Sequence, residues 1–116
     1  MSSNLGPKCE IASSLVIVGN PLTLAVNITA AAELDVERLH DWLFEKSPPA
    51  AQRLVTVLEA SFMKLADLPD RGRAVALGVR ELVVPFGGSK YLVRYEVREV
   101  GVFIARVWHG LEDRSA

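Results

Sequence analysis

The chain has 116 residues, of which 50% are hydrophobic and 23% charged, so we expect one globular domain with its own apolar core. The single cysteine, Cys9, excludes an intramolecular disulfide framework and a cysteine-based zinc site, and no apolar run approaches the roughly 18–20 residues that span a bilayer. The formal net charge of −1 gives no overall attraction to nucleic acid or to a membrane.

The charge is unevenly divided along the chain. Residues 1–70 carry five Lys/Arg against nine Asp/Glu, whereas residues 71–116 carry eight against five, and seven of these eight are arginines. Solvated surface charge is the commoner reason for such a pattern. The alternative is a basic face that attracts an acidic partner or a phosphate backbone.

We expect residues 1–20 to form a loosely ordered N-terminal extension and residues 21–116 to form one domain. Within the extension only Leu15–Val18 is strongly apolar, and it is too short for the hydrophobic region of a secretory signal. We interpret this run as a possible added edge strand. The Asn20-Pro21 dipeptide then marks the domain boundary.

A strand and two helices are predicted next. Leu22–Ile28 alternates apolar and small or polar residues, which is typical of a half-buried strand. A helix from about Ala30 to Lys46 follows, with Thr29 as its N-cap and Ala32, Val36, Leu39 and Leu43 on one face. Ser47 and Pro48 begin a second helix that runs to about Asp67. With almost no linker between them, the helices must form a hairpin.

Three strands complete the prediction: Val79–Phe86, Tyr91–Arg98 and Val102–Trp108. Short connections containing glycine separate them, so they should form an antiparallel meander. The order β-α-α-β-β-β predicts an α+β fold, in which the helical hairpin packs on one face of a mainly antiparallel four-stranded sheet.

One face of this sheet is the candidate site. Alternation places Arg94 and Arg98 opposite the apolar face of their strand, with Arg80 or Arg106 beside them and His109 at the rim. Arginine binds phosphate oxygens, and histidine transfers protons near neutral pH. The simpler interpretation is a hydrogen-bonded histidine at a strand end and arginines that solvate the open face. Strict alternation also places Trp108 on the face of Val102 and Ile104, and we expect Trp42 and Trp108 to be packing residues.

No catalytic Ser-His-Asp order, metal-ligand spacing or phosphate-binding glycine loop is present, so neither a cofactor nor a metal is predicted. Five segments resemble a known family: AAELD (31–35), LADLPDRGR (65–73), VRELVVPF (79–86), YLVRY (91–95) and VWHGLEDR (107–114). In this order, over residues 22–114, they resemble the RelE/ParE superfamily of bacterial toxins, and within it the ParE (plasmid-stabilisation) branch.

The resemblance implies a small cytoplasmic toxin of a type II toxin–antitoxin system, which inhibits DNA gyrase if ParE-like or cuts ribosome-bound mRNA if RelE-like. In the ribonuclease alternative, His109 would be the acid or base, and Arg80 and Arg94 would hold phosphate. Leu92 stands where ribonuclease members carry a strand arginine, and Gly110 where a tyrosine often stands. These differences favour gyrase inhibition. A third alternative is an inactive member that serves only as partner of its antitoxin.

The resemblance also implies a cognate antitoxin that forms a hetero-oligomer with the toxin and makes most of the DNA contacts. Its C-terminal segment would place a helix in an apolar groove beside residues 30–67 and a strand at a sheet edge. The basic half of the chain should attract an acidic segment. The residues we expect to bind antitoxin or target are Arg71, Arg73, Arg94, Arg98 and Arg106.

Overall fold

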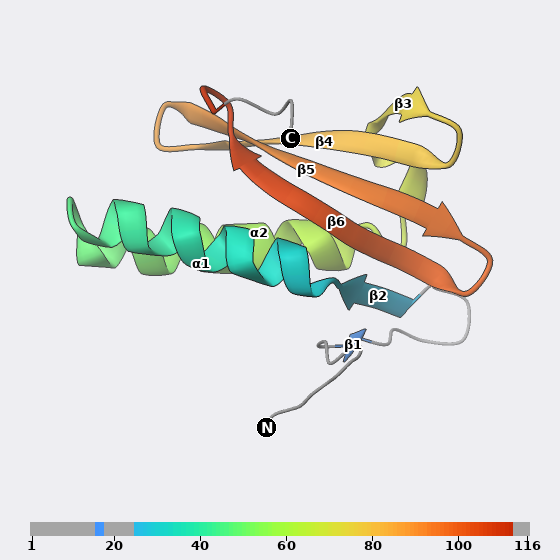
Figure 1. Ribbon diagram of the computed structural model, residues 1–116, viewed down its shortest axis with the longest axis horizontal. Helices are drawn as coiled ribbons and strands as arrows, with labels where there is room; N and C mark the ends of the chain where they lie inside the picture. Colours follow the sequence, from blue (N-terminus) through green and yellow to red (C-terminus); the bar gives the residue numbers. More distant parts are fainter. Residues whose placement is uncertain (1–15, 18–24, 113–116) are drawn as a thin grey trace.

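The computed structural model describes residues 16–17 and 25–112 (Figure 1). Its elements are β1 (Val16–Ile17), β2 (Ala25–Ile28), α1 (Ala30–Phe44), α2 (Pro48–Lys64), the 3₁₀ turn η1 (Pro69–Arg71), β3 (Arg73–Ala76), β4 (Val79–Phe86), β5 (Ser89–Arg98) and β6 (Gly101–His109). The predicted β-α-α-β-β-β order is confirmed, with β1 and β3 as additional short strands.

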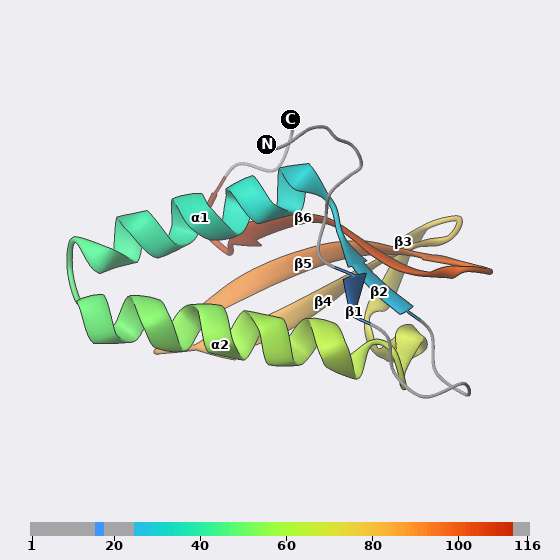
Figure 2. The ribbon, with the colours of Figure 1, turned by 90° about the horizontal axis from the view of Figure 1, so that it is seen from below.

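The strands form one sheet in the order β1-β2-β6-β5-β4-β3. Only β2 and β6 run parallel; all other neighbours are antiparallel. The two helices lie side by side on one face of this sheet and leave the other face without a covering layer of secondary structure (Figure 2). None of the described helices is long and apolar enough to cross a membrane.

Both helices begin at the predicted caps. The Thr29 hydroxyl oxygen accepts the Ala32 N–H at 3.2 Å, and the Ser47 hydroxyl oxygen accepts the Ala50 N–H at 3.3 Å. Each side chain thereby satisfies one of the backbone donors that the first turn of a helix leaves free. The helices end at Phe44 and Lys64, slightly before the predicted positions.

The core lies between the hairpin and the sheet. The apolar stripe of α2 is buried at every third or fourth residue, and the sheet contributes the alternate residues of β5. The largest fully buried side chains are Tyr95, Phe62, Leu54, Leu58, Leu65, Ile104, Val26, Val93, Val102 and Val107.

The antiparallel meander is also confirmed, and β4 has the predicted bounds. Gly87 and Gly88, with φ of 58° and 78°, form the two-residue turn between Phe86 and Ser89. This backbone region favours glycine and suits the twist of a tight hairpin. Leu22–Leu24 of the predicted first strand, and most of the predicted N-terminal extension, lie outside the described residues.

The sheet has more strands than the four predicted. β1 falls within the predicted run Leu15–Val18, whose ends lie outside the described residues, and pairs with β2 at the edge. β3 pairs with β4 at the opposite edge, and its four residues are all exposed. Because an exposed edge strand has no buried face, β3 carries no alternating pattern that could have predicted it.

Candidate functional site

A row of four charged residues crosses the open face of the sheet. Arg73, Glu81, Arg94 and Arg106 are directly opposed on β3, β4, β5 and β6. Glu81, only 5% exposed, binds Arg94 Nη2 at 2.7 Å and lies 3.8 Å from Arg73 Nη2. The carboxylate thus neutralises the centre of the row, and the predicted placement of Arg94 on the open face is confirmed.

Trp108 lies between two of these arginines. The Arg94 and Arg106 guanidinium carbons are 5.1 and 5.2 Å from the centre of its ring, and Trp108 is 3% exposed. Farther along β5, Arg98 lies 4.5 Å from the Phe103 ring and binds a neighbouring carboxylate. The arginines therefore cover aromatic surface on the open face, an arrangement that guanidinium groups favour.

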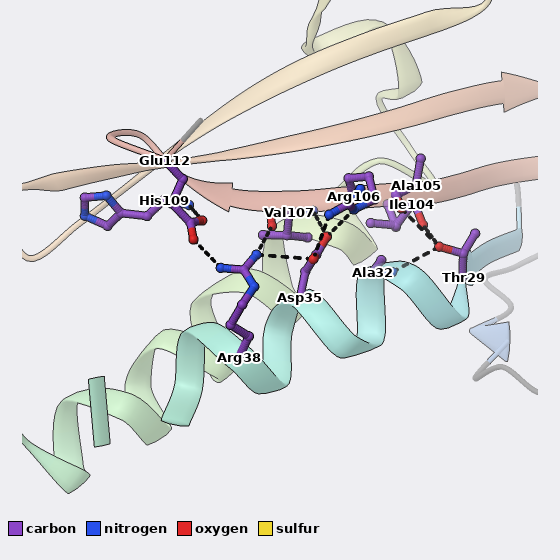
Figure 3. Close-up of polar contacts among 10 residues, drawn as sticks. All are labelled: Thr29, Ala32, Asp35, Arg38, Ile104, Ala105, Arg106, Val107, His109 and Glu112. Atoms are coloured by element: carbon purple, nitrogen blue, oxygen red, sulfur yellow. Dashed lines mark hydrogen bonds and ion pairs between the residues drawn. The ribbon is translucent and has the colours of Figure 1, made fainter. Parts of the chain in front are cut away.

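The row ends at Asp35 of α1, which is 4% exposed (Figure 3). Its carboxylate accepts Arg106 Nε at 2.7 Å, the Val107 backbone N–H at 2.8 Å and Arg38 Nη2 at 3.2 Å. Burial by itself would raise the pKa of Asp35, but these hydrogen bonds outweigh it and hold the pKa below its ordinary value. The same carboxylate raises the pKa of Arg106.

Asp35 belongs to a set of side chains that close the edge of β6 beyond the end of β2. The Thr29 hydroxyl donates to the Ile104 carbonyl at 2.8 Å, and Arg38 Nη2 donates to the Val107 carbonyl at 3.3 Å. Glu112 accepts the His109 backbone N–H at 2.8 Å and also binds the Arg38 guanidinium. These side chains form hydrogen bonds with backbone groups of β6 that a neighbouring strand would otherwise bind.

A bulge in β6 changes which residues face the helices. Arg94 opposes Arg106 whereas Tyr95 opposes Ile104, so Ala105 is an extra residue in the ladder. The expectation that Trp108 shares the face of Ile104 is therefore wrong: Trp108 lies on the open face. Val107 and His109 turn toward the helices instead.

His109 consequently lies among aromatic rings on the helix side of the sheet. Its ring is 5.1 Å from that of buried Tyr91 and 5.9 Å from that of Trp42 on α1. The Leu111 backbone N–H donates to its Nδ1 at 3.1 Å, which assigns the neutral ring's proton to Nε2. Figure 3 shows His109 pointing away from Arg106.

Arg80 also lies on the helix side of the sheet, opposite Tyr95 and at the far end from His109. Its guanidinium donates to the Gly72 carbonyl at 2.6 Å and lies 3.5 Å from the Asp70 carboxylate. The Tyr95 hydroxyl completes this cluster, because it accepts the Gly72 N–H at 2.8 Å and donates to the Pro69 carbonyl at 2.7 Å. Burial raises the pKa of Tyr95, although the Gly72 N–H opposes the shift.

An open pocket of about 400 Å³ lies between α1 and the end of β6. Trp42, which we expected to be a packing residue, is 49% exposed at this pocket, and its ring lies 5.9 Å from that of His109. The pocket is lined by Arg38, Leu39, Trp42, His109, Leu111 and Glu112. Among the residues that the structure describes, no cluster of histidine, cysteine and acidic side chains could hold a metal ion.

Comparison with known proteins identifies the family. Residues 26–114 match the model of the ParE toxin of the type II toxin–antitoxin system parDE. This chain belongs to the ParE toxin family. The toxin RelE1 of Caulobacter vibrioides is 43% identical over 93 residues, which cover 80% of this chain and all of RelE1. RelE3 of the same organism is 36% identical over 78% of this chain and 98% of its own length.

The fold and the family together make this chain a toxin of a type II toxin–antitoxin system, whose partner is a cognate antitoxin. The toxin brings four of the sequence-predicted arginines to its open face: Arg73, Arg94, Arg98 and Arg106. Arg71 is exposed on η1. Arg80, Arg94 and His109, the candidate catalytic set, are not brought together.

Sequence reasoning missed Asp35, Arg38 and Glu112, which fasten α1 to β6. One signal was present: Asp35 interrupts the apolar stripe of its helix, between Ala32 and Leu39. A charged residue at a buried helical position needs a partner, and that partner is Arg106 of the last strand, to which we had given only a binding role.

Proposed function

We propose that this toxin arrests growth by binding DNA gyrase in the cytoplasm and stabilising its cleaved DNA complexes, and that it carries out no chemistry of its own. The separation of the candidate catalytic groups is the observation that supports the proposal. Arg94 lies on the open face, whereas Arg80 and His109 lie at opposite ends of the helix face. General acid–base catalysis needs proton donor, acceptor and charge-stabilising groups around one reacting centre.

The two sequence differences from ribonuclease members support the same proposal. Leu92 lies in an apolar row with Val83 and Trp108, where it presents no charge to phosphate. At position 110, a Cβ atom would come within 2.9 Å of the Lys90 carbonyl oxygen, which accepts the Gly110 N–H at 2.7 Å. The close approach favours glycine at this position and excludes a tyrosine without a shift of the backbone.

Cleavage of ribosome-bound mRNA is the second candidate function, favoured by the partly exposed His109 at the pocket. One substitution separates the two functions. His109→Asn keeps an acceptor for the Leu111 N–H but removes the titratable ring. Under gyrase inhibition this variant should keep its toxicity; under acid–base catalysis it should lose activity about 100-fold or more.

The assay induces the toxin in bacteria, with and without its cognate antitoxin, and follows DNA damage, mRNA cleavage and growth. We expect a DNA-damage response that His109→Asn preserves, and inhibition of purified gyrase by the purified toxin. Cleaved mRNA that disappears with His109→Asn would replace the proposal by the ribonuclease. Normal growth would indicate an inactive member that only binds its antitoxin.

We further propose that the exposed arginines of the second half receive an acidic segment of the antitoxin. The accessible members are Arg71 on η1 and also Arg73 and Arg98, which have 78% and 55% of their side chains exposed. Arg94 and Arg106 are bound by Glu81 and Asp35 and serve the sheet itself. In the resulting hetero-oligomer, the antitoxin would make most of the DNA contacts.

A further inference from the structure

Another pocket lies at the end of the molecule where α1 turns into α2. The β4–β5 turn and the end of β6 lie at the same end, beside the helical hairpin (Figures 1 and 2). The pocket measures about 360 Å³, within the roughly 300–1,000 Å³ of sites that bind small molecules. Trp42 and His109 line it and also line the pocket between α1 and β6, so the two pockets adjoin.

Aromatic rings form one wall of this pocket. The ring centres of Phe86 and Tyr91 are 6.3 Å apart, those of Tyr91 and His109 are 5.1 Å apart, and those of His109 and Trp42 are 5.9 Å apart. Trp42 is 49% exposed and therefore presents ring surface to the pocket. Planar rings, including those of nucleobases, stack on such a surface.

The charged side chains of the pocket are cationic. Lys46 and Arg53 line it, whereas none of the described aspartates and glutamates does. Neither cation forms an ion pair with a carboxylate in the part of the chain that the structure describes, and the Lys46 ammonium lies 4.0 Å from the centre of the Trp42 ring. Two cations without a neutralising carboxylate favour an anion in the pocket.

The Tyr91 hydroxyl is a hydrogen-bond donor at this pocket that lacks an acceptor. Tyr91 is 2% exposed, and its hydroxyl makes no hydrogen bond within the described residues. The hydroxyl is not enclosed, because Arg94 Nε is the one enclosed side-chain atom without a partner among those residues. Burial and the negative charge of Glu112 raise the pKa of Tyr91, so the hydroxyl keeps its proton. Buried tyrosine hydroxyls usually have a partner, and a ligand in the pocket would supply it.

We propose that this pocket binds a free mononucleotide, with its base on the Trp42 ring and its phosphate between Lys46 and Arg53. A phosphate monoester carries about two negative charges near neutral pH, which match the two cations. The Tyr91 hydroxyl and the Nε2–H of His109 supply further donors. Arg80 and Arg94 do not line the pocket, so the site differs from the candidate catalytic set and does not depend on the gyrase target.

The surface beside the pocket favours a free nucleotide over a nucleic-acid strand. Asp41, directly before Trp42, and Glu45, directly before Lys46, are both exposed. A strand that continued from the pocket along α1 would bring further phosphates close to these carboxylates, and like charges repel.

Titration of the purified full chain with AMP, GMP, CMP and UMP tests the proposal. Adenosine and inorganic phosphate, each of which lacks one half of the ligand, are the controls. Because the pocket offers both a ring surface and two cations, the preferred nucleotide should bind at least about tenfold more tightly than either control. Base stacking should quench the fluorescence of Trp42, whereas Trp108 is 3% exposed and is shielded. Trp42→Phe should therefore abolish the quenching.

Two substitutions on α2 form a matched pair. Arg53→Gln removes a cation of the pocket, and Lys64→Gln removes an exposed cation from the last turn of the same helix. Arg53→Gln should weaken nucleotide binding about tenfold, whereas Lys64→Gln should leave the affinity within about twofold of the parent value. Tyr91→Phe should weaken binding about threefold without lowering the thermal midpoint of the free toxin, which separates a lost contact from a lost fold.

Three outcomes would overturn the proposal. They are equal affinities of Arg53→Gln and Lys64→Gln, no nucleotide that binds more tightly than inorganic phosphate, and a single-stranded oligonucleotide that binds more tightly than any mononucleotide. Inhibition of gyrase is measured separately, so failure of the nucleotide site and failure of the gyrase target are distinguishable.

Discussion

Asp35 is the residue through which α1 holds the exposed edge of β6. Its carboxylate accepts from two arginines and one backbone N–H while being almost fully buried. Asp35→Asn should lower the free energy of unfolding by about 2 kcal/mol. This is less than the loss of a fully buried pair, because Arg38 and Arg106 are 42% and 36% exposed and can be hydrated again. Chemical denaturation measures this change in the free energy of unfolding. Glu33→Gln, in the exposed first turn of α1, is a nearly neutral control.

The same carboxylate should make stability depend on pH in a defined direction. The folded-state pKa of Asp35 lies below 3.8, the ordinary value, so the folded protein binds fewer protons than the unfolded chain. Its stabilisation is therefore complete above pH 3.8 and is lost as the pH falls through the lowered pKa. The stability difference between the parent toxin and Asp35→Asn should be constant from pH 5 to 7 and shrink below about pH 4. A difference that grows on acidification would contradict the assignment.

Tyr95 organises the turn between α2 and the sheet. Tyr95→Phe removes an acceptor for the buried Gly72 N–H and a donor to the Pro69 carbonyl, so unfolding should become easier by about 1–3 kcal/mol. Tyr91→Phe is the matched control, because the Tyr91 hydroxyl makes no hydrogen bond within the described residues. In thermal unfolding, Tyr95→Phe should have a clearly lower midpoint temperature than Tyr91→Phe. Equal midpoints would mean that the turn does not depend on the Tyr95 hydroxyl.

Both tyrosines are buried on the apolar face of β5, a placement that follows from alternation along the strand and needs no information from elsewhere in the chain. Alternation could not predict the partners of their hydroxyls. The Pro69 carbonyl lies 26 residues away from Tyr95 in sequence, and only the assembled fold brings the two together. Residue-scale polar contacts were therefore the least predictable part of the structure.

At the scale of elements, Thr29 joins α1 to β6 through one side chain. It caps the helix and also donates to the strand carbonyl of Ile104. Thr29→Ala should destabilise the toxin by about 1–2 kcal/mol, whereas Thr29→Ser keeps the hydroxyl and most of the stability. The shift of the denaturant midpoint, at an unchanged dependence of the unfolding free energy on denaturant concentration, would measure this destabilisation. If the alanine and serine variants are equally destabilised, the hydroxyl contributes nothing to stability.

The elements themselves were largely predictable. Cap residues, the apolar stripe of α2 and the glycine turn all pointed to the same hairpin and meander, and local signals that agree in this way predict structure well. The bulge at Ala105 was not predictable, because nothing in the sequence of β6 marks the extra residue. Because of this one extra residue, His109 lies on the helix side of the sheet and Arg94 on the open face. The candidate catalytic set required both residues on the same face.

At the scale of the whole molecule, the exposed arginines should steer the antitoxin. Reversing Arg71, Arg73 and Arg98 to glutamate should slow antitoxin association about tenfold or more at low salt, and the parent rate should fall as salt rises, since screening shortens to about 3 Å at 1 M. Lys46, Arg53 and Lys64, all on the helical hairpin, provide a control with the same change in net charge. Equal slowing in both triple variants would assign the effect to net charge rather than to the arginine face.

The parallel pairing of β2 with β6 has a kinetic consequence. It joins residues 25–28 to residues 101–104, the most distant contact in the sheet, whereas β4, β5 and β6 pair through short turns. Closing so large a loop is entropically costly, so the meander should form first and β2 should join last. Val26→Ala would then accelerate unfolding and leave the folding rate nearly unchanged, as stopped-flow measurements can show. A newly made toxin would thus exist briefly as a meander whose apolar face is not yet closed by β2, and this is the stage at which its core is most exposed to water.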